Sequence, residues 1–461
     1  MAANAEPTVA PDMFSGPVGP LLWRLALPIY ASTLFWVAYT LTDIYWISRI
    51  DPGDPAIVGG VSLIIPVYML AFALSNGLLI GVKSLVARAI GAGNVELLNR
   101  VASAGLALAA IASVIFIALG YGWSEEIALS LGAVGDLHEH AHTFLLYILP
   151  ATALQFAFNV LSGIAQGEGQ MKPVMHAMGL GIGLNLVLGP ILILALDFGV
   201  AGAALATCIA QAVSLLYLAR IFFGGTMQVP LHVNILRARP EAMAKILEVG
   251  LPQGLAEILV AFYLFAINRI VVGIDPTAMT AFGLCARVDQ LLLLSIAAIS
   301  SAILTAVAQN AARGNLTRVR ELQRAAIRGG VALVLAQAAL LVVFAPWIYG
   351  LLSETEAVIS YAVSQTRIVN PAYLFAVPTL IYHAVFLAVG HPWPAITIQF
   401  LKMFVVTLPL VLLLNHFYDL GMYGLWFGIV AGEVSAAVIG RAWNAACHAR
   451  LQRGELIVVG A

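Results

Sequence analysis

Asp43 is the residue of this sequence best placed for chemistry, because it is a carboxylate inside the long apolar stretch 21–50. Placing a charged carboxylate in hydrocarbon costs about 2.5–3.5 kcal/mol, so such a residue is expected to face a polar cavity on an ion pathway. Tyr39, Thr40 and Trp46 lie three or four residues away and would share its helix face. These side chains suit a proton site or a cation site. The alternative is an acid close enough to the membrane surface to be solvated.

A second group of polar residues lies in the other apolar stretches of the first half of the chain. Thr207 and Gln211, four residues apart, would share one helix face. For any one residue of the group, hydrogen bonding between helices is an equally good explanation. Their concentration in the half that holds Asp43 nevertheless favours a polar pocket there. The group comprises Gln155, Asn159, Ser162, Asn185, Thr207 and Gln211.

Glu257 and His383 are secondary candidates from the second half of the chain. Glu257 comes one turn after Pro252 and has no obvious partner close by in the sequence, which makes it the stronger of the two. The other buried charges of this half are expected to form structural pairs, Lys402 with Glu433 and Arg287 with Asp289.

The elements that must position these residues are membrane-spanning helices. Of the 461 residues, 61% are hydrophobic and 10% are charged, whereas soluble domains carry about 25% charged residues. Only helices and closed barrels satisfy the backbone inside lipid, and long apolar runs without strict alternation predict helices. We therefore predict an all-α integral membrane protein with twelve transmembrane helices. The predicted segments are 20–49, 56–82, 99–123, 138–165, 174–196, 200–223, 244–273, 278–308, 325–351, 358–389, 393–415 and 420–446.

The connections between these segments alternate in charge. Arginines crowd the stretch 313–328, whereas the stretch 125–139 is acidic. Because basic loops face the cytoplasm, we predict a multi-pass protein of the cell inner (plasma) membrane with both termini cytoplasmic. The first residues lack the basic start and apolar core of a signal peptide.

The chain also repeats itself, with landmarks that recur at an offset of 221–224 residues. Six spans in each half would bring both halves into the membrane from the same side. The halves are then parallel repeats, two lobes related by a pseudo-two-fold axis along the membrane normal. Transporters built from repeats bind substrate near the midplane and rock around that site. The paired landmarks are Leu27-Pro28 with Leu251-Pro252, Asp51-Pro52 with Asp275-Pro276, Gly93-Asn94 with Gly314-Asn315, and Gly169 with Gly390.

The polar stretch 224–243 is the expected boundary between the two lobes, and Asp43 has no acidic counterpart in the second lobe, where Ile267 takes its place. The expected domains are a cytoplasmic tail at 1–19, a six-helix lobe at 20–223, a cytoplasmic linker at 224–243, a second six-helix lobe at 244–447 and a cytoplasmic tail at 448–461.

Other kinds of chemistry find no support in the sequence. The three cysteines lie far apart, which predicts neither a disulfide framework nor a metal site. A net charge of −1 gives no reason to expect a nucleic-acid partner. No ATP-binding loop, zinc-protease motif or nucleophile elbow is present. We expect no enzyme activity, no cofactor and no metal.

Several motifs, taken in order, resemble the multidrug and toxic compound extrusion (MATE) family, with details similar to its DinF-like branch. Together they cover essentially the whole chain. The resemblance implies two V-shaped six-helix lobes that exchange protons or sodium ions for organic cations. The motifs are LALP at 25–28 with Asp43 fifteen residues later, LVARAIGAGN at 85–94, GEGQMKP at 167–173, GVAGAALAT at 199–207, AVAQNAARGN at 306–315 and ARVDQLLLL at 286–294.

The resemblance also implies roles for individual residues. Asp43 matches the acid on the first helix that serves the DinF-like branch as proton site. The family's fifth-helix motif reads Asn-x-x-x-Asp-Pro, and this chain keeps Asn185 but has Gly189 where the second acid stands. Thr207 and Asn159 match polar positions on the sixth and fourth helices. A single acid still suffices for antiport, since one proton and one cation can compete for it.

We therefore expect a monomeric, secondary-active multidrug efflux transporter that antiports protons against amphipathic, cationic organic compounds by alternating access. Its partners would be these small molecules, protons and membrane lipids. The alternatives are sodium coupling, a flippase for lipid-linked precursors and, from another class, a polytopic membrane enzyme. A flippase would need a large cationic cavity, and a membrane enzyme would need acids or histidines clustered at one membrane face.

Overall fold

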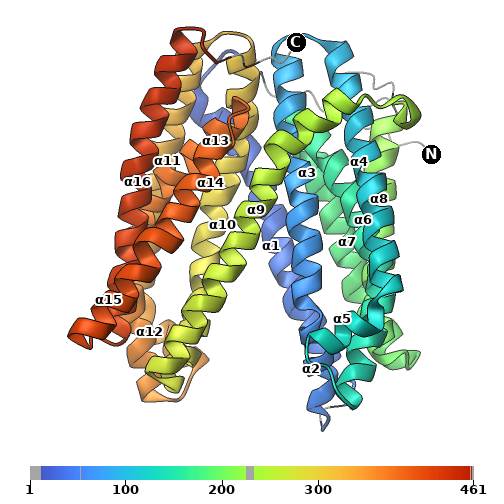
Figure 1. The fold of residues 1–461 in the computed structure, drawn as a ribbon, viewed down its shortest axis with the longest axis vertical. Coiled ribbons are helices and arrows are strands. Elements are labelled where there is room, and N and C mark those ends of the chain that lie inside the picture. The colour runs from blue at the N-terminus through green and yellow to red at the C-terminus, as the bar shows by residue number, and fades with distance from the viewer. Residues whose placement is uncertain (1–11, 52, 225–232, 457, 459–461) are drawn as a thin grey trace. The chain divides into compact units, whose positions relative to one another are not determined.

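Membrane-length helices make up the protein in the computed structural model, which describes residues 12–51, 53–224, 233–456 and 458. Within this part of the chain, twelve helical spans are long and apolar enough to cross a membrane, so the predicted all-α architecture is confirmed (Figure 1). The α-helices are α1 Val18–Ile47, α2 Pro55–Leu63, α3 Ile65–Gly91, α4 Val95–Gly122, α5 Ser124–Ser130, α6 Asp136–Gly167, α7 Met171–Pro190, α8 Gly199–Phe223, α9 Pro240–Ile274, α10 Pro276–Ala312, α11 Leu316–Leu352, α12 Glu356–Val369, α13 Tyr373–Ala388, α14 Trp393–Phe400, α15 Leu408–Tyr418 and α16 Met422–Gln452.

Some spans combine two helices, and some helices run beyond the predicted segments. α2 with α3, α12 with α13, and α14 with α15 each form one span. α3 continues to Gly91 and α11 begins at Leu316, several residues outside the apolar runs, because basic side chains at a helix end remain helical although they lower the hydropathy. The first residues of the expected N-terminal tail, 1–11, most of the expected linker, 225–232, and four residues of the C-terminal tail lie outside the described residues.

The glycine–asparagine landmarks of the repeat are turns between helices. Gly93 and Gly314 have φ values of 68° and 79°, a conformation that glycine adopts without the steric cost of a Cβ atom. The next residues, Asn94 and Asn315, cap α4 and α11, and each side-chain oxygen accepts from the backbone N–H three residues later, at 2.9 and 3.2 Å. The repeat is therefore kept where the chain must stop one helix and start the next.

Two further helix caps show that one of the predicted pairs of repeat landmarks is wrong. Asp54 caps α2 and Asp275 caps α10, each accepting from the backbone N–H two residues on at 2.8 Å, and a proline follows each aspartate. The structural counterpart of Asp275-Pro276 is thus Asp54-Pro55 and not Asp51-Pro52. The two halves differ by an extra turn of chain after α1, which is why the offset falls from 224 to 221 residues along the repeat.

Contacts group the described helices into two compact units, which we describe separately. Unit 1 contains residues 31–254, and unit 2 contains residues 12–30 and 255–461. In unit 1, α6 packs against α3, α4 and α8; in unit 2, α10 packs against α11, α12 and α13. α1 and α9 each contribute to both units, and the change of unit comes two residues after Pro28 in α1 and two residues after Pro252 in α9.

The described end of the N-terminal tail is held against unit 2. Asn310 donates from Nδ2 to the Met13 carbonyl at 3.0 Å, and Arg318 donates to the Ser15 carbonyl at 2.9 Å. The Ser15 hydroxyl also donates to the Asp12 carboxylate and, with nearby backbone N–H groups, holds the pKa of Asp12 below its usual value. These bonds fix the chain just before it enters α1.

Glycines allow the first part of α9 to lie against α3 inside unit 1. A Cβ atom added to Gly77 would lie 2.5 Å from the Gly250 carbonyl oxygen, and one added to Gly250 would lie 2.5 Å from that of Gly77. One helical turn further, Gly254 would place a Cβ atom 3.0 Å from the Ala73 carbonyl. Small residues at this spacing allow helix backbones to approach closely in membranes.

Gly250→Ala is therefore expected to lower the free energy of unfolding, by about 1–3 kcal/mol, because backbone atoms cannot move aside for the new methyl group. Gly183→Ala in α7 is the matched control, since nothing lies within 4 Å of its Cβ position. Alanine is the better helix former, so the control variant should be as stable as the wild type or more stable. Thermal unfolding of the two variants in one detergent measures both effects. Equal stability of the two would contradict the close packing.

Candidate functional site

Asp43 forms a hydrogen-bonded group with α7 and α8 inside unit 1. It lies half-buried on α1, four residues before that helix ends. In the amide orientation that satisfies both of its polar atoms, Asn185 of α7 donates to Asp43 Oδ1 at 3.1 Å and accepts from the Thr207 backbone N–H at 3.3 Å. The structure thus brings together three residues that the sequence singled out.

Tyr39 joins this group from α1, one turn before Asp43. Its hydroxyl lies 2.8 Å from Thr207 Oγ1 and also interacts with the Asp43 carboxylate. Thr207 Oγ1 donates to the Ala203 carbonyl at 3.1 Å. Because a hydroxyl carries a single hydrogen, Tyr39 can donate to Thr207 or to Asp43 but not to both at once.

Tyr68 of α3 is a neighbour that the sequence analysis missed. It is close enough to Asp43 for an electrostatic interaction, and it packs against the small cluster of Ile148, Ala151 and Ala204. A tyrosine in an apolar run resembles a lipid-facing or interfacial aromatic residue. Only the packing of α3 beside the Asp43 group reveals it as part of the site.

Trp46 and Thr40 share the α1 face of Asp43 but have other contacts. The Trp46 ring packs against a cluster that includes Ile47 and Val200, and its buried Nε1 has no hydrogen-bond partner among the described residues. A Cβ atom added to Gly189 would lie 3.5 Å from Trp46 Cδ1. Gly189, where the family resemblance implies a second acid, therefore faces an indole. The Thr40 hydroxyl donates to a carbonyl of its own helix at 3.0 Å.

Asn159 and Gln211 lie outside the hydrogen bonds of the Asp43 group. Asn159 is buried and donates from Nδ2 to Ser75 Oγ at 2.9 Å, two helical turns along α3 from Tyr68. Gln211 is half-buried one turn after Thr207, and the described residues show no hydrogen bond between its side chain and the group. Both residues remain candidates for lining a wider cavity, but neither contacts the Asp43 carboxylate.

The secondary candidates both lie in unit 2. Glu257 is half-buried on α9, where Oε2 is shielded from solvent. His383 is half-buried on α13 and interacts electrostatically with Lys402. Lys402 itself forms an ion pair with Glu433 of α16, which confirms the predicted pair.

Asp289 is another buried carboxylate, and the prediction that it pairs with Arg287 is wrong. Residues two apart on a helix do not face each other, and Arg287 is exposed. Tyr373 of α13 instead donates to Asp289 Oδ2 at 3.0 Å, and the fully buried Asn370 is also close. Unit 2 therefore contains a buried acid that the sequence analysis wrongly assigned to a structural ion pair.

Lys83 is a further buried charge that the sequence analysis passed over. It is fully buried on α3 and donates to Gln166 Oε1 of α6 at 2.9 Å. The predicted segment ended at residue 82, so this lysine lay just outside it. The helix in fact continues for another nine residues.

Metal ligands are not gathered anywhere in the described part of the chain, because no three histidine, cysteine or acidic side chains there could hold one ion. Its three cysteines are free thiols. What the Asp43 group offers is one carboxylate among hydroxyl and amide donors, an arrangement suited to binding a proton or a small cation.

The MatE family model matches this chain twice, at residues 28–191 and 252–413. The two matches begin at Pro28 and Pro252, which agrees with the internal repeat. Among curated proteins, the multidrug export protein MepA of Staphylococcus aureus (strain MRSA252) is 25% identical over 427 residues, covering 92% of each chain.

Solved structures show the same fold. An outward-facing multidrug resistance MATE transporter of the MOP superfamily matches with a TM-score of 0.90 at 27% identity, covering 97% of this chain and 99% of that one. The MATE transporter ClbM, solved with Rb⁺, matches with a TM-score of 0.86 at 32% identity, covering 96% of this chain and 99% of that one.

Proposed function

The chain belongs to the MatE family of multi-pass membrane transporters, and we propose that it exports amphipathic, cationic organic compounds in exchange for protons. Export of several drugs is supported by the similarity to MepA along nearly the full length. We further propose alternating access as the transport cycle, a monomer as the working unit, and the inner (plasma) membrane as its location, with both termini cytoplasmic.

The observation that carries proton coupling is the hydrogen bonding of Asp43. Asn185 directs an N–H group at one carboxylate oxygen, and the Tyr39 hydroxyl is within reach of the carboxylate. Both groups stabilise the charged form by donating to it. A proton that binds to Asp43 removes the charge that strengthens these bonds, so protonation weakens the attachment of α1 to α7.

The Tyr39 hydroxyl can transmit the protonation of Asp43 to α8. When Asp43 is charged, the Tyr39 hydroxyl donates to the carboxylate. When Asp43 is protonated, its own O–H can donate to the Tyr39 oxygen, and Tyr39 then donates to Thr207, which lies 2.8 Å away. In this proposed mechanism, proton binding neutralises the acid that attracts a cationic substrate and turns the Tyr39 hydroxyl from Asp43 to Thr207, which adds a hydrogen bond between α1 and α8.

Sodium coupling is the principal alternative, and the donor set weighs against it. A sodium ion needs several oxygen ligands, whereas Asn185 directs an N–H group at Asp43. Gly189 supplies no second carboxylate. A flippase for lipid-linked anions would require basic residues in the pocket, and the Asp43 group presents an acid.

Transport into proteoliposomes that contain the purified chain tests the proposal, with pH and sodium gradients applied separately. A pH gradient alone is expected to drive transport of a fluorescent organic cation, and a sodium gradient alone is not. Transport driven by sodium alone would overturn proton coupling. Transport of an anionic lipid-linked precursor, with none of the cation, would favour the flippase.

A further inference from the structure

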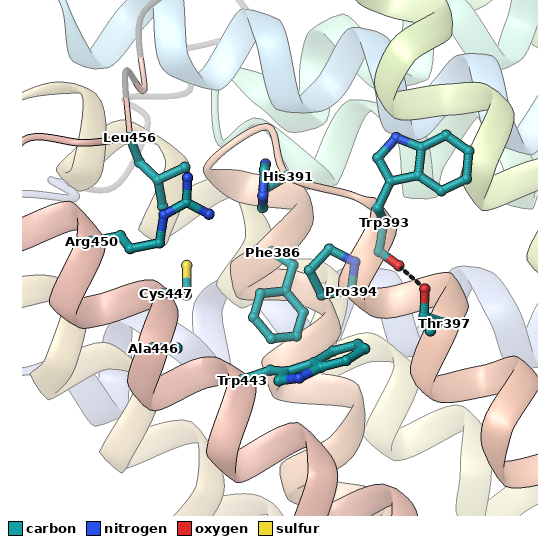
Figure 2. Close-up of a pocket in the computed structure, with 10 residues that line it drawn as sticks. All are labelled: Phe386, His391, Trp393, Pro394, Thr397, Trp443, Ala446, Cys447, Arg450 and Leu456. Carbon is teal, nitrogen blue, oxygen red and sulfur yellow. Dashed lines mark hydrogen bonds between the residues drawn. The ribbon is translucent and has the colours of Figure 1, made fainter.

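A pocket of about 330 Å³ lies in unit 2, where α13 ends, α14 begins and α16 ends. Its lining includes Phe386 of α13, Trp393 of α14, and Trp443 and Arg450 of α16, together with Leu456 of the chain after α16 (Figure 2). We call it the C-terminal pocket. Its volume is within the range of about 300–1,000 Å³ that is usual for small-molecule sites.

The pocket lies at the edge of the membrane-spanning region. The three spans that meet there end at Ala388, begin at Trp393 and end at Gln452. Trp393 is 60% exposed, and tryptophan is enriched at the level of the lipid head groups. The pocket is therefore open to molecules whose polar part lies in the head-group layer.

The chemistry of the lining combines one cationic end with an aromatic wall. Arg450 supplies a guanidinium group, which suits the planar, bidentate binding of phosphate oxygens. Trp443, which is half-buried, supplies apolar ring surface beside it, whereas Phe386 is fully buried in the wall of the pocket. Basic pockets between transmembrane helices bind the head groups of anionic lipids.

The chain after α16 already presents a similar pair of groups to the pocket. The Glu455 carboxylate lies 3.7 Å from Arg450 Nε and 2.6 Å from Arg453 Nε. The next residue, Leu456, places an aliphatic side chain in the lining. A carboxylate next to an aliphatic side chain resembles the phosphate and acyl chain of a lipid, because each combines an anionic group with an apolar one.

We propose that the C-terminal pocket binds the phosphate head group of an anionic phospholipid through Arg450, with the start of an acyl chain against Trp443. Glu455 pairs with Arg450 and Arg453 when no lipid is bound, so the chain after α16 competes with the lipid for Arg450. The proposal concerns a site separate from the Asp43 group and does not depend on which ion drives transport.

Native mass spectrometry of the detergent-purified full chain, titrated with phosphatidylglycerol, tests the proposal. Arg450→Gln is expected to weaken lipid binding at least about tenfold, because it removes a charge-assisted hydrogen bond. Arg441→Gln is the matched control, since Arg441 is an exposed arginine of the same helix that does not line the pocket. Glu455→Gln should change affinity in the opposite direction, strengthening binding by up to about fivefold.

The lipid's chemistry is tested with three further ligands. Phosphatidylcholine, which carries no net charge, is expected to bind more weakly than phosphatidylglycerol, and glycerol 3-phosphate or inorganic phosphate should bind weakly because neither brings an acyl chain. Equal binding of phosphatidylglycerol by wild type, Arg450→Gln and Glu455→Gln would overturn the proposal. Binding of inorganic phosphate as tight as that of the lipid would show a site for a soluble anion instead.

Discussion

Asp43→Asn is expected to reduce pH-driven efflux strongly, with a fall of about 5- to 150-fold in the transport that a pH gradient supports. The amide has nearly the shape of the carboxylic acid but cannot release a proton, so the hydrogen bonds to Asn185 and Tyr39 no longer depend on pH. The measurement is counterflow and pH-driven transport of the same organic cation in proteoliposomes. Counterflow, which needs no net proton movement, separates loss of coupling from loss of substrate binding.

Asp289→Asn is the matched control for this prediction. Asp289 is also a carboxylate within a span, only 4% exposed, and it accepts a hydrogen bond from a tyrosine as Asp43 does. We expect the control variant to keep pH-driven efflux, because the Asp43 group of unit 1 is intact. Wild-type coupling in Asp43→Asn together with loss in Asp289→Asn would move the proton site to unit 2.

The helices of this protein could be predicted from the sequence because a single physical constraint dominates them. A backbone in lipid must satisfy its own hydrogen bonds, so apolar runs mark helices, and all twelve predicted spans are present. Helix ends were harder to place, since Lys83 and Arg318 remain helical while lowering the hydropathy. Pairing Asp275 with Asp51 instead of Asp54 failed for a related reason. A proline follows both aspartates in the sequence, but only the capping hydrogen bond shows which aspartate starts a helix.

The Asp43 group could be predicted only where its members lie on one helix or match a family motif. Tyr39 follows from helical spacing, and Asn185 and Thr207 follow from the resemblance. Tyr68 could not be found this way, because its place beside Asp43 depends on how α3 packs. Spacing also failed to separate Tyr39, which contacts the carboxylate, from Thr40, which bonds to its own helix.

Buried charges outside the Asp43 group show a different use of polar residues. Lys83 is fully buried with an amide partner, and Lys402 forms an ion pair with Glu433, whose side chain is 6% exposed. Hydrogen bonds and ion pairs of this kind fix which helix faces meet, since lipid gives apolar faces no reason to prefer one partner. They contribute to stability only while both partners are present.

Lys402→Met is therefore expected to lower the free energy of unfolding by about 3–5 kcal/mol, because it leaves the Glu433 carboxylate buried without its cation. The double variant Lys402→Met/Glu433→Gln should recover most of that loss, since two neutral side chains of similar size need no charge compensation. Titration with SDS in mixed micelles, followed by the loss of helical circular dichroism, measures both variants on one scale.

The exposed pair of Arg100 with Glu96 on α4 provides the control. Its side chains are 38% and 73% exposed, against 17% and 6% for Lys402 and Glu433. Water screens the exposed pair, so Arg100→Met should cost less than about 1 kcal/mol. If Lys402→Met cost no more than Arg100→Met, the buried carboxylate would have to be neutral or hydrated without its partner, and the pair would have no part in holding α16 in unit 2. The charges are coupled if the double variant recovers the stability that Lys402→Met loses, while Glu433→Gln made alone is not more stable than the wild type.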